Sequence, residues 1–93
     1  MKRFAYLKKR GYSVHFSSLP EQCFGICDHQ KKEILIDPYM NIYDTFIHEY
    51  LHARYPKKSE DQIYKMTIRV RMRTSRKQIR KEIIYLLVHT KWV

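Results

Sequence analysis

The chain is 93 residues long, 44% hydrophobic and 30% charged, with a formal net charge of +10. This composition favours a soluble globular chain over a disordered one, and no apolar run approaches the roughly 20 residues that span a bilayer. The basic N-terminus has too short an apolar stretch for a signal peptide, and Cys23 and Cys27 are too few for a disulfide framework. We therefore expect one cytoplasmic domain over residues 1–93, monomeric and without a membrane partner.

The first half of the chain is predicted to be rich in β-strands. Residues 2–10 fit either a short helix closed by Gly11 or a further strand, and helix is favoured. Pro38 ends the last strand, because proline cannot donate a hydrogen bond to a ladder. Apolar alternation and β-forming residues predict strands over residues 12–16, 23–27 and 33–37.

The second half is predicted to be helical. Asn41 is a suitable N-cap for a helix that ends near Tyr55, since Pro56 disfavours the helical conformation of the residue before it. Two further helices open with capping-box spacing, and each is followed by apolar residues at helical spacing. The boxes are Ser59 with Gln62 and Ser75 with Gln78. The residues predicted to face inward are Ile63, Met66, Thr67 and Val70, then Ile79, Ile83, Leu86 and Leu87.

The predicted fold class is α+β. A small antiparallel or mixed sheet of about three strands is followed by three helices.

Residues 48–52 have the HExxH pattern within the first of these helices: His48-Glu49-Tyr50-Leu51-His52. Positions i and i+4 share one helix face, so both imidazoles can reach a single tetrahedral zinc ion. Glu49 is offset around the helix, which directs its carboxylate towards a water at the metal rather than the metal itself. The pattern therefore predicts His48 and His52 as metal ligands, Zn²⁺ as the cofactor and Glu49 as the general base of a metallopeptidase.

A catalytic zinc ion needs a third protein ligand and one open position. Glu60 is the best candidate, because the short connection after Tyr55 turns the chain back and leaves Glu60 in the first turn of the next helix. The alternative is that Glu60 binds no metal and only stabilises the N-terminus of its helix through the helix dipole. Asp61 is a rival with a shorter side chain, and Asp44, one turn before His48, could orient a ligand histidine.

The order of strand, turn, strand, HExxH helix and second helix resembles the minigluzincins. These are minimal zinc metallopeptidases of roughly this length, found notably in archaea, and the resemblance implies a minimal zincin-like scaffold. The resemblance covers about residues 23–70 and depends on Thr45-Phe46-Ile47-His48-Glu49-Tyr50-Leu51-His52-Ala53 followed by Ser59-Glu60-Asp61.

The resemblance implies that Glu60 completes a His-His-Glu site and that the substrate is a peptide or an unfolded protein. It also implies latent forms in which a terminal segment blocks the cleft, and either end of so short a domain can reach it. The strand near residues 23–27 is expected to bind an extended peptide by strand addition, through Phe24, Gly25, Ile26 and Cys27.

One position departs from the pattern of larger gluzincins. They carry an aspartate four residues after the glutamate ligand, where it supports a ligand histidine, and here that position is Tyr64. We therefore expect either that this support is built differently or that the site is weaker. We expect Tyr64 to be a core residue. Tyr64, Tyr85 and His89 are each candidates to donate a hydrogen bond to the transition-state oxyanion, and the sequence selects none of them.

Basic residues dominate residues 69–81, which contain no acid. Such a run suggests nucleic acid or another polyanion as a partner, and it fits a solvated helix face equally well. The first predicted function is therefore a zinc-dependent endopeptidase, active or latent. The alternative is a nucleic-acid-binding module with a structural or regulatory zinc ion, whose footprint would be Arg69, Arg71, Arg73, Arg76, Lys77, Arg80 and Lys81.

Overall fold

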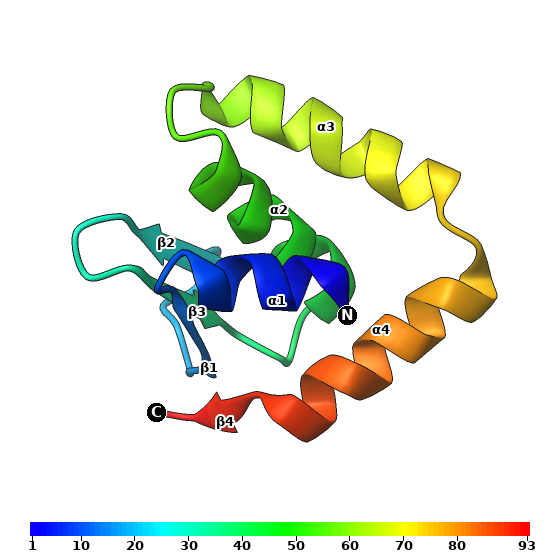
Figure 1. Cartoon of the computed structure of the whole chain (residues 1–93), viewed down its shortest axis with the longest axis horizontal. Helices are drawn as coiled ribbons and strands as arrows, with labels where there is room; N and C mark the ends of the chain where they lie inside the picture. Colours follow the sequence, from blue (N-terminus) through cyan, green and yellow to red (C-terminus); the bar gives the residue numbers. More distant parts are fainter.

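Four helices pack around a four-stranded mixed sheet in the computed structural model, which describes residues 1–93 (Figure 1). The predicted α+β class is confirmed, and so is the helix favoured near the N-terminus. In chain order the elements are α1 (Lys2–Lys9), β1 (Ser13–Phe16), β2 (Gly25–Asp28), β3 (Glu33–Ile36), α2 (Ile42–Arg54), α3 (Glu60–Arg73), α4 (Arg76–His89) and β4 (Lys91–Trp92).

The sheet has the order β2-β3-β1-β4, which leaves β2 at one edge and β4 at the other. β2 runs antiparallel to β3, whereas β1 runs parallel to both β3 and β4. Alternate residues of the two central strands are buried in the core: Val14, Phe16, Ile34 and Ile36. The sequence did not predict β4, because a two-residue strand has no periodicity of its own.

α2 is the central element, and it packs against α1, α3, α4, β2 and β3. Helical spacing puts its apolar residues in the core on more than one side, and Tyr43, Phe46 and Ile47 are almost fully buried. The helix ends at Arg54 with Tyr55 as its C-cap, just before Pro56, in agreement with the predicted end near Tyr55. Asn41 is the N-cap residue, but its side chain donates a hydrogen bond to Asp44 rather than capping the helix.

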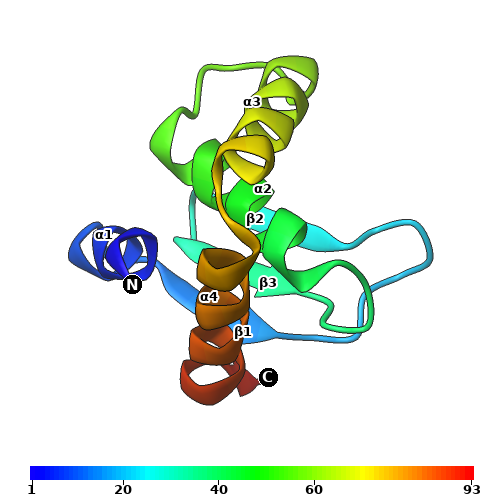
Figure 2. The same ribbon diagram turned by 90° about the vertical axis from the view of Figure 1, so that its right-hand side faces the viewer.

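The two serines predicted to open the last two helices are the N-cap residues of α3 and α4. Ser59 accepts a hydrogen bond from the Gln62 backbone N–H, and the Gln62 side chain bonds back to Ser59, so this capping box is complete. Ser75 accepts from the Gln78 backbone, but the Gln78 side chain donates to Glu82 and the second box is half formed. Figure 2 shows the result, with α3 at the top and α4 running down the side that faces the viewer.

The buried stripe of α4 differs from the prediction in one position. Leu86 is buried as expected, whereas Leu87 is 56% exposed, so its assignment to the apolar stripe was wrong. Glu82, which was not among the residues predicted to face inward, is buried and pairs with Arg3 from α1. Neither α4 nor any other helix is long and apolar enough to cross a membrane.

Candidate metal centre

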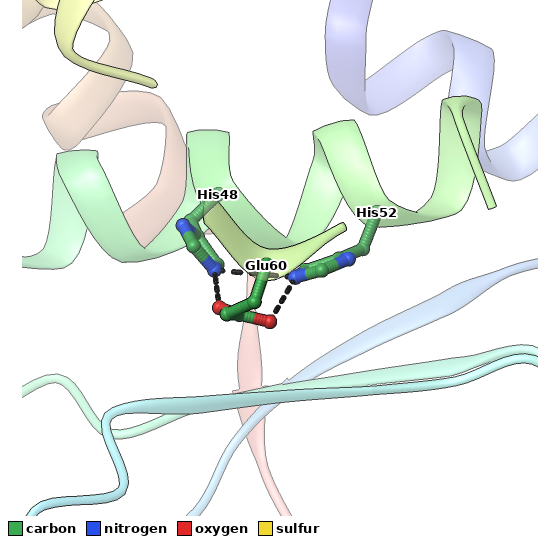
Figure 3. A group of neighbouring side chains, drawn as sticks. All are labelled: His48, His52 and Glu60. Carbon is green, nitrogen blue, oxygen red and sulfur yellow. Dashed lines mark hydrogen bonds and ion pairs between the residues drawn. The ribbon is translucent and has the colours of Figure 1, made fainter. Parts of the chain in front are cut away.

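One turn of α2 presents His48 and His52 on the same side of the helix (Figure 3). Their rings meet edge to face with centroids 4.8 Å apart, and the two Nε2 atoms are separated by 3.2 Å. Both side chains are 18% exposed, so they lie at the base of an open depression rather than in the core.

Glu60, the first residue of α3, completes the group. The connection between α2 and α3 turns the chain back, and one carboxylate oxygen of Glu60 lies 2.8 Å from Nε2 of His52 while the other pairs with Nε2 of His48. One donor atom from each of the three residues lies within 4.8 Å of the others. Asp61, the rival ligand, points elsewhere and pairs with Lys65 at 3.1 Å.

The three donors fit a tetrahedral cation. Two nitrogen ligands at 2.0–2.1 Å from zinc and at a tetrahedral angle lie about 3.3 Å apart, close to the 3.2 Å between the two imidazoles. Burial lowers the pKa of His52, which outweighs the opposing effect of the Glu60 carboxylate and favours the neutral imidazole that binds metal. Burial raises the pKa of Glu60, but His48 and His52 outweigh it and leave that pKa lowered, so the carboxylate is the favoured form.

The second nitrogen of His48 is supported by Thr67 rather than by an acid. Thr67 Oγ1 donates to the Ile63 carbonyl at 2.9 Å and lies 3.5 Å from Nδ1 of His48, where it can accept a hydrogen bond. Such a bond would hold the ring with Nε2 towards the cation. Asp44, which the sequence offered as a candidate to orient a ligand histidine, pairs instead with Arg71 at 2.6 Å. Thr67 was visible in the sequence only as a member of the buried stripe of α3.

We expect Thr67→Val to lower zinc affinity about tenfold, because ligand orientation would be lost while the volume of the side chain is kept. Affinity is measured by competition with a chromogenic chelator. Thr74→Val is the matched control, since the Thr74 hydroxyl bonds to the backbone of the same helix at 2.6 Å but does not contact the site. Equal affinities of the two variants would show that the Thr67 hydroxyl does not support His48.

Glu49 lies beside the three donors but is not one of them. It is 7% exposed, and its pKa is raised to about 7 by burial and by the nearby Glu60 carboxylate. β2 covers it closely, because a Cβ atom on Gly25 would come within 2.9 Å of the Glu49 side chain and 2.7 Å of Thr45. The glycine therefore allows the edge strand to lie against the carboxylate.

Gly25→Ala is expected to destabilise the metal-free protein by about 1–3 kcal/mol, since the added methyl group overpacks the space between β2 and α2. Urea unfolding provides the measurement. Ile26→Ala on the same strand is the control, because Ile26 is 39% exposed and should change the midpoint little. A Gly25 variant as stable as the Ile26 variant would contradict the close contact.

Two cavities flank the group of donors. The larger, of about 480 Å³, lies between the start of β2, α2 and α3, and its lining includes His48, Glu49, Glu60 and Tyr64. The smaller, of about 290 Å³, is lined by both His52 and Glu60. The four residues predicted to bind substrate all line these cavities: Phe24 and Gly25 the larger, and Gly25, Ile26 and Cys27 the smaller.

Of the three candidate oxyanion donors, only Tyr64 lies at the cleft. It is 59% exposed, so its predicted place in the core was wrong. Tyr85 packs against Phe4 and His89, and neither Tyr85 nor His89 lines either cavity.

Neither terminal segment lines the cleft in this structure. α1 packs against α2, while β4 pairs with β1 at the sheet edge opposite β2. Trp92 packs on Phe16 and Tyr39 there. A latent form blocked by a terminal segment would therefore need a different placement of that segment.

Comparison of the chain with models of known protein families, with curated proteins and with solved structures finds no match.

Proposed function

We propose that this chain is a zinc-dependent peptidase. The observation that carries the proposal is the convergence of His48, His52 and Glu60 on one point, with the Glu49 carboxylate beside them in an open cleft. Within that class, the HExxH helix followed by the Glu60 helix favours an endopeptidase of the minigluzincin type.

The chemistry is divided between the cation and the chain. Held by His48, His52 and Glu60, zinc would supply a Lewis acid that polarises the scissile carbonyl and makes water more acidic. Glu49 takes a proton from the attacking water and passes it to the leaving amine, which is general base and then general acid catalysis. Tyr64 is the one candidate at the cleft to donate a hydrogen bond to the oxyanion.

The free edge of β2 would hold the substrate. The Phe24 carbonyl accepts a hydrogen bond from Asp37, so backbone alternation turns the N–H and C=O groups of Gly25 and Cys27 away from β3. An extended peptide can add to these groups as a further strand. Because Gly25 lies against Glu49, a peptide bound there would pass directly over the general base.

The test combines metal content with proteolysis. The zinc-loaded protein is incubated with a reduced and alkylated protein that cannot fold, and fragments are identified by mass spectrometry. We expect cleavage that a chelator stops and added zinc restores. Full-length protein and variants trimmed at either end are compared, because trimming would release a latent form. Failure to bind zinc would overturn the proposal, and zinc binding without cleavage by any form would leave only a metal site.

A further inference from the structure

The outward side of α4 carries a mixed set of residues that the core does not use. Ile79, Ile83 and Leu86 face the core on one side of this helix. On the opposite side, residues spaced three and four apart form what we call the α4 outer face: Lys77, Arg80, Lys81, Ile84, Leu87 and Val88. In Figure 2 no other element lies between α4 and the viewer.

The C-terminal half of the α4 outer face is apolar and exposed. Ile84 is 61% exposed, Leu87 56% and Val88 69%. Single exposed aliphatic residues are ordinary, but three neighbours on two turns of one helix form a patch, and such patches mark interaction sites.

The N-terminal half of the α4 outer face is basic and free of ion pairs. Lys77, Arg80 and Lys81 are exposed, and none of the ion pairs in the structure includes them. The one acid of α4, Glu82, points inward to Arg3. The adjoining bases Arg69, Arg73 and Arg76 are also exposed, so the field at this side of the molecule is positive.

Three kinds of partner can be compared with the apolar and basic halves of the α4 outer face: a second copy of the chain, a nucleic acid and a membrane. A second copy would bring its own cations against these, in a chain of net charge +10, and like charges oppose that contact. A nucleic acid would neutralise the bases, but it would cover Ile84, Leu87 and Val88 with phosphates, and the face has no aromatic residue on which a base could stack. A membrane with anionic headgroups fits both halves of the face. The aliphatic side chains can be buried among the acyl chains, and the basic side chains can pair with the anionic headgroups.

The sequence alone led us to expect no membrane partner. From the structure, we propose that the α4 outer face binds the surface of a membrane rich in anionic lipid. From Lys77 to Val88 the helix is about 16 Å long, so a modest tilt inserts its apolar end while Lys77, Arg80 and Lys81 stay at the headgroups. No residue of this face lines the cavities beside His48 and His52, so the cleft stays open to solvent when the protein is docked. The docking is independent of the zinc site.

The test is co-sedimentation of the full chain with vesicles of phosphatidylcholine alone or with about 30% phosphatidylserine. We expect binding only to the anionic vesicles. Each basic residue near such a surface strengthens binding about fivefold, so the triple variant Lys77→Gln, Arg80→Gln, Lys81→Gln should bind on the order of 100-fold more weakly. The charge-matched control, Lys9→Gln, Lys31→Gln, Lys57→Gln, removes exposed bases outside α4 and should bind more strongly than the first variant.

A second variant tests the apolar half without disturbing the fold. Ile84→Ala, Leu87→Ala, Val88→Ala keeps or raises helix propensity, and we expect at least about tenfold weaker binding to anionic vesicles. Unchanged vesicle binding by this variant would overturn the proposal. If duplex DNA or RNA then abolished that unchanged vesicle binding, the face would be a polyanion site. The proposal would also be overturned if the full chain sedimented as a dimer that the alanine variant dissociates, because the occupant would then be a second copy.

Discussion

Replacing Glu49 with glutamine is expected to stop peptide hydrolysis while zinc stays bound. The amide keeps the shape of the side chain but cannot take a proton from water, and general base catalysis contributes about 10²–10⁴-fold to a rate. Fold should be retained, because burial raises the pKa of Glu49 and the ionised form therefore costs stability that the neutral amide does not. The measurements are the cleavage rate of an unfolded protein and zinc content after dialysis.

Asp61→Asn is the matched control for Glu49→Gln. It also replaces a carboxylate near the cleft, but Asp61 pairs with Lys65 on the surface of α3, so cleavage should continue at nearly the wild-type rate. If Glu49→Gln cleaved as fast as Asp61→Asn, the role of Glu49 as the proton carrier would be wrong even if the metal site were right.

Replacing His52 with alanine is expected to lower zinc affinity by more than about 100-fold. The loss of a partner that only orients a ligand costs about 10–100-fold, and the loss of the ligand itself should cost more. His29→Ala is the control, because His29 bonds to the Tyr12 hydroxyl and is not among the three donors. Affinity is measured by chelator competition, with thermal unfolding of the metal-free variants to show that both are folded. Equal zinc affinities of the His52 and His29 variants would contradict the proposed metal site, and the enzymatic proposal that depends on it.

The parts of the site that could be predicted from sequence are those set by local geometry. His48 and His52 share a face because they are four residues apart on one helix, whatever that helix packs against. Glu60 follows from a short connection and a capping box, which fix where the next helix starts. These relations involve neighbouring turns of the chain, so a pattern of residues was enough.

The parts that the sequence did not predict depend on how separate elements pack. Thr67 contacts His48 because α3 packs against α2, and this contact cannot be predicted from the residue spacing within either helix. Tyr64 points to the cleft and Leu87 to solvent for the same reason, since a helix with apolar residues on several sides can bury any of them. β4 exists only through its pairing with β1, which lies some 75 residues earlier in the chain.

All three proposed ligands come from one short stretch of chain, residues 48–60. Closing so short a loop costs little entropy, so a cation could join α2 to α3 before the sheet is in place. The cation would then act as a cross-link between two consecutive helices. Its removal should accelerate amide hydrogen exchange first in the connection between them, while exchange in β1 and β3 stays slow.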